Sequence, residues 1–303
     1  MIPDAFNYRE LVQNLTQGRF LAQEWPDGVP FKEGGESFVF YAKDLRLNMR
    51  EAAIKVAKDQ VKESKRLLIR FFRGAAIQAH LHYMRLPGVP DIYEAGEHFY
   101  IVEFVKGQKL LDAVKENESA WSLLSQLFRL AHSIHENRII YRDFKPENLL
   151  IDKNGLLWLL DYGLAKQYED KSSAITKIGE RLGSPLFLTE MLQDDAAKAT
   201  FDDDIQQLGK ILWVCLMQRL PETEMEYNST IAFADPPLTW AKYYLGSQGK
   251  RYKTAMAFAQ EIERDFKITP CMQSHQQKFT CPVLMQSQEA MNKILSLLSE
   301  TLE

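Results

Sequence analysis

The chain has 303 residues, enough for one large two-part domain or for two ordinary domains. Hydrophobic residues make up 46% of it and charged residues 26%, which is typical of a globular chain and excludes a disordered one. The formal net charge of −4 gives no basis for a nucleic-acid surface, which normally needs a basic face. We therefore expect no nucleic-acid partner.

Three cysteines are too few and too scattered for a disulfide framework or a zinc site. Cys215 lies inside the apolar stretch ILWVCLM and is expected in the core, while Cys271 and Cys281 could pair but are expected to stay reduced. The N-terminus lacks the features of a secretory signal, and no apolar stretch approaches the roughly 18 residues that cross a bilayer. These patterns predict a cytoplasmic protein with no membrane partner, and they leave delivery into another cell open.

The first part of the chain is predicted to be rich in β-strands. Residues 1–28 are mixed in character and are expected to form an N-terminal extension. FVFYAKD and AAIKVAK, between Phe31 and Lys58, are short alternating or apolar stretches that predict antiparallel strands. Residues 61–86 carry apolar side chains at helical spacing, which predicts one long helix. Two further strands are expected around Ile92–Ala95 and Phe99–Phe104.

The second part is predicted to be mainly helical. Apolar or amphipathic stretches predict helices over residues 121–136, 205–217 and 284–301. Two short apolar stretches around the turn DKNG predict strands over residues 149–151 and 156–160. Residues 164–190 form a long polar loop with Ser172, Ser173, Thr176 and Ser184, and a structureless stretch of that length is usually functional. Residues 221–280 show little pattern.

The segment YRDFKPENLL (141–150) and the DYG of 161–163 carry the chemistry. Phosphoryl transfer needs an acceptor hydroxyl placed in line with the γ-phosphate and cations that offset the developing charge. Asp143 can take the hydroxyl proton, and Lys145, two positions on, can neutralise phosphate oxygens. Asn148 and Asp161 offer the oxygen ligands that Mg²⁺ prefers.

In this order and at this spacing, the two segments closely resemble the catalytic and magnesium loops of eukaryotic-type protein kinases, as in a divergent bacterial or phage-like member. The resemblance covers residues 30–220. It implies an α+β, bilobal protein-kinase-like fold, with a small antiparallel β-sheet and one long helix in the N-lobe and a mainly helical C-lobe. The implied division is 1–28 for the extension, 29–105 for the N-lobe and 106–303 for the C-lobe of a single kinase domain.

The resemblance also implies a set of site residues. The catalytic residues would be Asp143, Lys145 and Asn148, and the metal ligands Asn148 and Asp161, with Mg²⁺ or Mn²⁺ as the ion. ATP would contact residues of the degraded glycine-rich loop KEGGESFV, the AAIK strand, the hinge IVEFVKG and the strand after the catalytic loop: Gly34, Gly35, Ser37, Val39, Ala53, Lys55, Val102, Glu103, Val105 and Leu150. Lys55 would hold the α- and β-phosphates, Ala53 and Leu150 would sandwich adenine, and Val102 would be the gatekeeper. The backbone of Glu103 and Val105 would bond adenine, and Asp204 would bond the catalytic-loop backbone in a structural role.

Three features depart from the family pattern. Lys32 and Ser37 replace the outer glycines of the phosphate loop, where glycine lets the backbone approach phosphate closely. The long helix lacks the glutamate that normally holds the strand lysine, because no acidic residue occurs between Lys65 and Asp91; Gln78, Asp161 or another carboxylate remain as partners for Lys55. The segment GSPLFLTE (183–190), which would end at Glu190, lacks the usual proline, and Arg142 belongs to the subtype that a loop phosphate can switch.

We expect an enzyme, a protein kinase that phosphorylates protein hydroxyls, serine and threonine before tyrosine, and that autophosphorylates. A pseudokinase that acts as a binding or scaffolding module is the alternative, supported by the missing helix glutamate and the altered phosphate loop. A small-molecule kinase fits less well, because such enzymes usually lack the lysine of KPEN. His80, His82, His132 and His135 are expected in packing or surface roles, and the sequence names neither the protein substrate nor an oligomeric state.

Overall fold

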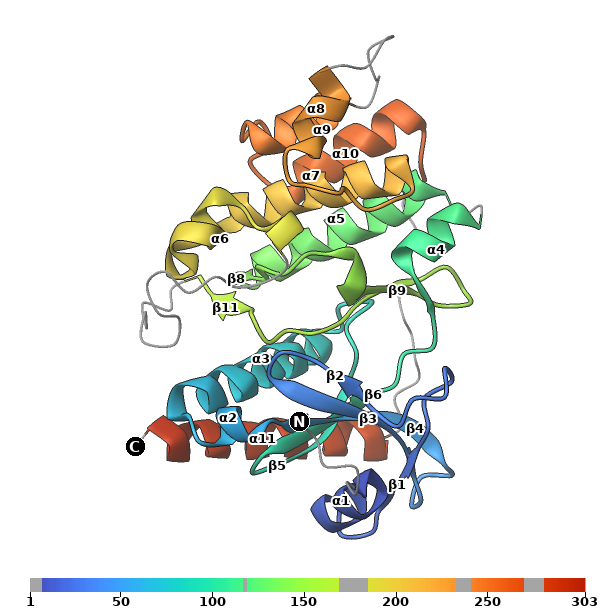
Figure 1. The fold of residues 1–303 in the computed structure, drawn as a ribbon, viewed down its shortest axis with the longest axis vertical. Coiled ribbons are helices and arrows are strands. Elements are labelled where there is room, and N and C mark those ends of the chain that lie inside the picture. The colour runs from blue at the N-terminus through green and yellow to red at the C-terminus, as the bar shows by residue number, and fades with distance from the viewer. Residues whose placement is uncertain (1–6, 117–118, 169–184, 233–240, 270–280, 303) are drawn as a thin grey trace. The chain divides into compact units, whose positions relative to one another are not determined.

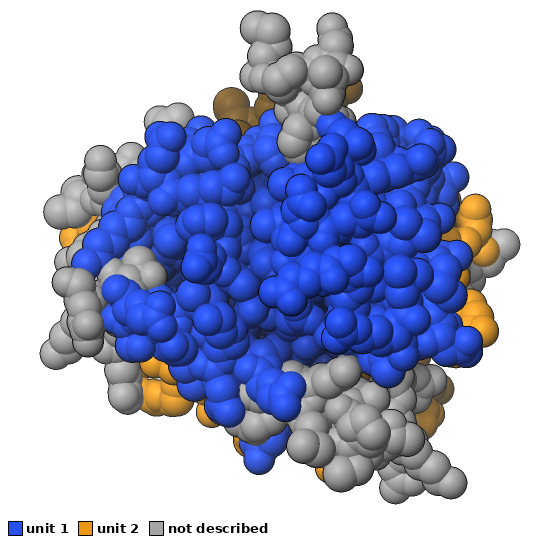
Figure 2. All heavy atoms as spheres, turned by 90° about the horizontal axis from the view of Figure 1, so that it is seen from below, with its two compact units in different colours: residues 1–83, 90–104, 276–303 blue, residues 84–89, 105–275 orange. Residues whose placement is uncertain are grey.

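The structure is a computed structural model that describes residues 7–116, 119–168, 185–232, 241–269 and 281–302. It divides into two compact units, coloured separately in Figure 2. Unit 1 comprises residues 1–83, 90–104 and 276–303, and unit 2 comprises residues 84–89 and 105–275. Among the described residues, no helix is both long enough and apolar enough to pass through a bilayer.

Unit 1 is built on an antiparallel sheet, as predicted (Figure 1). The strand order is β1-β3-β4-β6-β5, and β2 pairs with β3. The strands are β1 (Phe20–Gln23), β2 (Lys32–Glu33), β3 (Ser37–Asp44), β4 (Arg50–Ala57), β5 (Ile92–Gly96) and β6 (Phe99–Glu103). The register places Val39 opposite Lys55 and Ala53 opposite Val102.

The residues expected to be an N-terminal extension contribute to this sheet. After helix α1 (Tyr8–Leu15), strand β1 pairs antiparallel with β3 from Phe20 opposite Asp44 to Gln23 opposite Tyr41. Val12 and Phe20 are fully buried in one apolar cluster with Phe40 of β3. Because their side chains complete the core on this face of the sheet, α1 and β1 are integral parts of unit 1.

Two helices follow β4 where one was predicted. The short helix α2 (Asp59–Lys62) ends at Glu63, and α3 (Lys65–Tyr83) begins two residues later. The hydroxyl of Ser64 accepts a hydrogen bond of 3.4 Å from the backbone N–H of Leu67, so it satisfies a free donor in the first turn of α3. The break therefore comes from a local serine cap, which favours a new helix start.

The final helix, α11 (Cys281–Leu302), packs against α3 and β5 and belongs to unit 1. Ala290, Ile294 and Leu297 are buried in one apolar cluster with Phe72 and Ile92. The expected boundaries placed residues 106–303 together in the second lobe, so this helix is a correction to them. Its apolar stripe predicted that a partner surface exists, but the stripe carries no information about which surface that is.

Unit 2 is mainly helical, as predicted, with two small sheets ordered β10-β9-β7 and β11-β8. Its strands are β7 (Gln108–Lys109), β8 (Ile139–Ile140), β9 (Leu149–Ile151), β10 (Leu157–Leu159) and β11 (Lys166–Gln167). Its α-helices are α4 (Leu110–Lys115), α5 (Ala120–Glu136), α6 (Glu190–Asp194), α7 (Phe201–Met217), α8 (Glu226–Ala232), α9 (Ala241–Gln248) and α10 (Ala255–Phe266). The part of unit 2 that the structure describes also has the short 3-10 helices η1 (Pro146–Asn148), η2 (Pro185–Phe187) and η3 (Ala196–Lys198).

Helices α5, α7 and α10 supply the core of unit 2. Phe128 of α5 and Phe258 of α10 are fully buried, with ring centroids 4.3 Å apart. Cys215 of α7 is 2% exposed, which confirms its predicted place in the core. Cys271 lies outside the described residues, as does the side chain of Cys281, so their pairing stays a prediction.

Candidate active site

The loop between β8 and β9 carries the predicted catalytic residues, and α7 fixes its backbone. Asp204, in the first turn of α7, is fully buried. Its Oδ2 accepts a hydrogen bond of 2.8 Å from the N–H of Tyr141, and its Oδ1 accepts one of 2.7 Å from the N–H of Arg142. The expectation that Asp204 bonds the loop backbone is confirmed, and His135 Nε2 lies 2.9 Å from the same carboxylate.

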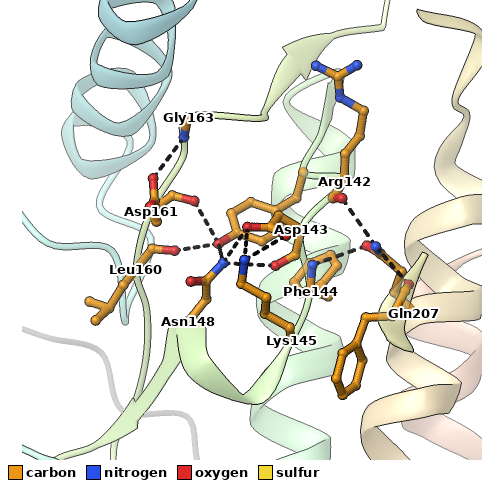
Figure 3. Close-up of polar contacts among 11 residues, drawn as sticks. Arg142, Asp143, Phe144, Lys145, Asn148, Leu160, Asp161, Gly163 and Gln207 are labelled. Atoms are coloured by element: carbon orange, nitrogen blue, oxygen red, sulfur yellow. Dashed lines mark hydrogen bonds and ion pairs between the residues drawn. The ribbon is translucent and has the colours of Figure 1, made fainter. Parts of the chain in front are cut away.

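Gln207, one helical turn after Asp204, is a second support that the sequence analysis missed. Its Oε1 accepts a 3.1 Å hydrogen bond from the N–H of Phe144, and its Nε2 donates one of 3.2 Å to the carbonyl of Arg142 (Figure 3). An amide three positions after the motif residue Asp204, a spacing that puts both on one face of a helix, was the available signal. Together the two side chains satisfy both sides of the loop backbone from one helix face.

Two residues of the site have backbone angles that favour glycine. Arg142 has a φ of 67° and Asp161 a φ of 57°, both in the left-handed region. Such a conformation costs a non-glycine residue about 1–2 kcal/mol and persists only where surrounding contacts compensate. For Arg142, the contacts are those of Asp204 and Gln207 with its backbone N–H and carbonyl. Strain of this kind gathers at functional sites.

Asp143, Lys145 and Asn148 form one polar cluster (Figure 3). Lys145 Nζ lies 2.8 Å from Oδ2 of Asp143, and Asn148 Nδ2 donates a hydrogen bond of 2.8 Å to the same oxygen. The guanidinium of Arg142 points away from this cluster and donates instead to the carbonyls of Leu164 and Ala196. The structure thus brings the three predicted catalytic side chains together and excludes the neighbouring arginine from them.

The surroundings of Asp143 favour proton uptake. Burial raises the pKa of this carboxyl to about 6, and the charge of Asp161 acts in the same direction. The ammonium of Lys145 and the amide of Asn148 oppose the rise, because both stabilise the ionised form. A carboxylate with a pKa near the working pH suits a general base, which must be ionised yet able to take a proton.

Asp161 follows strand β10 and is fixed through its backbone. Its carbonyl accepts a 2.9 Å hydrogen bond from the hydroxyl of Tyr141, which also donates to the carbonyl of Leu160. Asp161 Oδ1 accepts a hydrogen bond of 3.2 Å from the N–H of Gly163 (Figure 3). Tyr141 was not among the predicted site residues. Asn148 Nδ2 also lies 3.3 Å from the Tyr141 hydroxyl oxygen. The Tyr141 phenol therefore connects the catalytic loop to the DYG segment.

The residues present fit a divalent cation. The amide nitrogen of Asn148 is used by Asp143 and Tyr141, and no described residue donates to its Oδ1. The amide is therefore oriented with a carbonyl oxygen available as a ligand. Asp161 supplies a carboxylate close enough to Asp143 to raise its pKa, and a cation relieves such like-charge repulsion. Oxygen ligands of this type are the ones that Mg²⁺ prefers.

The predicted nucleotide residues are divided between the two units. In unit 1, Val39, Ala53 and Val102 belong to one apolar cluster on strands β3, β4 and β6. Lys55 lies on β4 with its Nζ 5.8 Å from the ring centroid of Tyr100. Val105 and Leu150 belong to unit 2, with Leu150 on β9 opposite Lys109.

The hydrogen bonds of Glu103 narrow the expectation that its backbone would bond adenine. Its backbone N–H donates a 2.9 Å hydrogen bond to the carbonyl of Asp91, so only its own carbonyl is left for adenine. Its side chain is occupied as well, because the carboxylate accepts a 3.2 Å hydrogen bond from the N–H of Asp91. Burial raises the pKa of the Glu103 carboxyl, and this hydrogen bond opposes the rise.

Comparison with known proteins shows which family the chain belongs to. A family model described as "Protein kinase domain" matches residues 33–292, which is most of the chain. This chain belongs to the protein kinase family. The α+β fold expected from the catalytic segments is thereby confirmed, and members of the family use ATP and Mg²⁺.

Several curated bacterial proteins resemble this kinase domain. It is 33% identical over 190 residues to a probable serine/threonine-protein kinase, CPE1738, of Clostridium perfringens, covering 60% of this chain and 27% of the relative. It is 30% identical over 223 residues to the probable serine/threonine-protein kinase PknB of Lactococcus lactis, covering 72% and 35%. PrkC of Bacillus subtilis, a serine/threonine-protein kinase, is 31% identical over 194 residues, covering 62% and 29%. The matched part of this chain thus spans about a third or less of the length of each relative.

The segment that ends at Glu190 in this kinase domain is anchored through Thr189, not through Glu190. Glu190 is exposed at the start of α6 and makes no hydrogen bond or ion pair with any described residue. Thr189, one position earlier, is buried and donates a 2.5 Å hydrogen bond from its hydroxyl to Oδ1 of Asp203. The residues proposed to accept a switching phosphate, Ser172, Ser173 and Thr176, lie outside the described residues, so that expectation stays a prediction.

His82 and His132, like His135, each lie near a single carboxylate. His82 Nε2 lies 3.6 Å from Asp91, and His132 Nε2 lies 3.5 Å from Glu136. Within the described ranges, groups of three or more histidine, cysteine, aspartate or glutamate side chains suited to a metal ion were not found. The oxygens of Asn148 and Asp161 would form a different kind of site, to which a bound nucleotide would add phosphate oxygens.

Proposed function

We propose that this chain is an ATP-dependent protein kinase that transfers the γ-phosphoryl group of ATP to a protein hydroxyl. The observation that carries the proposal is the joint arrangement of Asp143, Lys145 and Asn148 on a loop that Asp204 fixes from α7. Family membership and the names of the serine/threonine-protein kinases it resembles support serine or threonine as the acceptor.

Asp143 receives the proton. In the reaction, the acceptor oxygen attacks the γ-phosphorus, the bond to the β,γ-bridging oxygen breaks, and ADP leaves with the electron pair. The hydroxyl proton passes to the Asp143 carboxylate, whose pKa of about 6 suits this task. The ammonium of Lys145 lies beside the Asp143 carboxylate and therefore close to the reacting groups. There it offsets the negative charge that builds up on the γ-phosphate oxygens.

Asn148 and Asp161 are the side chains that would hold Mg²⁺. The ion, when bound, neutralises charge on the phosphate oxygens and orients them for in-line transfer. The hydrogen bonds from Asn148 Nδ2 to Asp143 orient the amide so that its oxygen serves this purpose. Lys55, Ala53, Val102 and Leu150 would contact the nucleotide itself, and the backbone of Val105 would bond adenine.

The missing acidic residue in α3 and the altered phosphate loop are the two observations that favour a pseudokinase. They bear on Lys55 and on the loop, whereas the groups expected to touch the metal and the acceptor are intact. Labelling with [γ-³²P]ATP separates the two functions. The purified chain should label itself or a generic protein acceptor in the presence of Mg²⁺, and acid hydrolysis should release phosphoserine or phosphothreonine.

Variants make the test specific. Asp143→Asn and Asp161→Asn should abolish labelling, while Asp194→Asn should label as the unmodified chain does. Asp194 is an exposed carboxylate of α6 whose side chain makes no hydrogen bond or ion pair with a described residue, so it controls for the loss of charge alone. If the unmodified chain and both variants all fail to label with Mg²⁺ and with Mn²⁺, the result would favour a pseudokinase that acts as a scaffold. The substrate protein stays unidentified, and the cytoplasmic location expected from the sequence stays a prediction.

A further inference from the structure

Helix α3 carries an arginine in its second turn that pairs with the phosphate loop. Arg70 is 6% exposed, and its guanidinium forms an ion pair and hydrogen bond with the carboxylate of Glu36. Glu36 belongs to the segment KEGGESFV, which is the degraded glycine-rich loop. Both residues lie in unit 1, and 34 positions separate them in the sequence.

The turn that carries Glu36 is fastened at several further points. It connects β2 to β3 and is closed by a 2.9 Å hydrogen bond from the N–H of Gly34 to the carbonyl of Ser37. The N–H of Lys58 donates a 3.0 Å hydrogen bond to the carbonyl of Glu36, and Gln60 Nε2 donates one of 3.2 Å to the carbonyl of Gly35. The loop is thus attached to the chain after β4 by its backbone carbonyls and by the ion pair of Glu33 with Lys58, and to α3 by the side chain of Glu36.

The charges of this pair matter for ATP binding, because the loop would lie over the phosphates. The Arg70 side chain is 7% exposed and the Glu36 side chain 24%, so water screens their attraction less than on an open surface. If the loop covers the phosphates of ATP, an uncompensated carboxylate at position 36 would repel them. Arg70 cancels that charge and at the same time couples the position of the loop to α3.

We propose that Glu36 and Arg70 are a positioning pair that connects the phosphate loop to α3 and compensates the charge of the Glu36 carboxylate for ATP binding. This inference rests on the proposed ATP-dependent function. The ion pair that normally joins strand lysine to helix glutamate cannot form here with α3, because α3 has no acidic residue from Lys65 to Tyr83. The Glu36–Arg70 pair instead connects α3 to the loop. In this pair the helix supplies the positive charge and the loop supplies the negative charge.

A binding experiment tests the pair without requiring phosphoryl transfer. Calorimetric dissociation constants for Mg²⁺–ATP and for adenosine would be measured on the full chain and on Arg70→Met. Arg70→Met should weaken ATP about tenfold, the equivalent of about 1.4 kcal/mol, and should leave adenosine unchanged because adenosine carries no phosphate. Arg70→Lys keeps the positive charge and should bind ATP within about threefold of the unmodified chain.

Suppression by Glu36→Gln is the decisive result. The double variant Glu36→Gln/Arg70→Met removes the repelling carboxylate and should recover ATP affinity to within about threefold of the unmodified chain. Asp59→Asn is the matched control, because Asp59 pairs with Lys62 in the neighbouring helix α2 at a side-chain exposure of 88%. This control should change neither affinity, and thermal unfolding of every variant would show that it is folded.

Two outcomes would overturn the pair and leave the proposed function standing. One is a double variant that binds ATP as weakly as Arg70→Met, and the other is a loss that is equal for ATP and adenosine. If Arg70→Met does not fold, Glu36→Gln and Arg70→Lys serve in its place. Glu36→Gln should bind ATP no more weakly than the unmodified chain, because it removes the carboxylate that repels phosphate. A tenfold loss of ATP affinity in Glu36→Gln or in Arg70→Lys would then count against the pair. An unmodified chain that binds no ATP would overturn the proposed function and this inference together.

Discussion

Lys145 Nζ lies 2.8 Å from Oδ2 of Asp143 and 3.1 Å from Oδ1, so its ammonium faces both oxygens of the carboxylate. The contact joins two residues that are two positions apart in the loop, and the backbone of Lys145 is extended, with φ −154° and ψ 155°. A proton acceptor and a cation therefore stand side by side, which is the arrangement that transfer to a hydroxyl requires.

Replacing Lys145 should separate charge compensation from proton transfer. Lys145→Met should lower kcat by about 10²–10³, the usual cost of removing one group that stabilises transition-state charge. Asp143→Asn should lower it at least as much. Steady-state rates at saturating ATP provide the measurement, and a Lys145→Met enzyme with unchanged kcat would exclude Lys145 from the reaction.

Gln207 should act on the reaction only through the loop. Gln207→Leu removes the acceptor of the Phe144 N–H, and leaving such a buried donor unsatisfied costs about 1–3 kcal/mol of folding stability. We expect kcat to fall while the ATP dissociation constant stays the same, because Gln207 contacts the loop backbone. Gln206→Leu is the matched control, since the Gln206 side chain is half-buried and bonds no described residue. Equal effects of the two changes would contradict this role.

The final helix should be needed for the stability of unit 1. Ile294 is 0% exposed in the cluster that joins α11 to α3, whereas its neighbour Leu295 is 51% exposed. Ile294→Ala should lower the free energy of unfolding by about 2–5 kcal/mol, and Leu295→Ala should lower it by well under half of that. Urea unfolding followed by circular dichroism measures both. Similar losses for the two variants would show that α11 does not pack on α3 as described.

Glu263 should give the chain a defined sensitivity to acid. Burial by itself would raise the pKa of this carboxyl, but hydrogen bonds from Arg129 at 2.6 Å and from Ser125 outweigh burial and lower it. A lowered folded-state pKa contributes stability that is fully present above the unfolded value of about 4.3 and is lost as the pH falls through the folded value.

The measurement compares urea midpoints from pH 7 downwards. Glu263→Gln should be less stable at pH 7, and its difference from the unmodified chain should shrink as the pH falls below about 4.3. Glu97→Gln is the control, because Glu97 is exposed and its side chain makes no hydrogen bond or ion pair with a described residue. A difference that grows towards low pH would mean that the Glu263 pKa is raised in the folded state.

The sequence by itself determined the parts of the site that are close together along the chain. Asp143, Lys145 and Asn148 lie within six residues, so their spacing and the turn at Pro146 suffice to bring their side chains together. The strands of unit 1 were predicted for the same reason, because the alternation of apolar and polar residues is a local pattern. Asp204 was identified from a motif, and its fully buried carboxylate bonds the loop as expected.

The tertiary structure decided the contacts between distant segments. An amphipathic stripe on residues 284–301 predicts a buried face but no partner for it, and the partner proved to be α3 and β5. Glu36 and Arg70 each look like ordinary surface charges in the sequence, and Gln207 looks like a polar interruption of an apolar helix. Their roles depend on which side chains meet in space, and that is set by how helices and strands pack, a property of the whole chain that no local pattern contains.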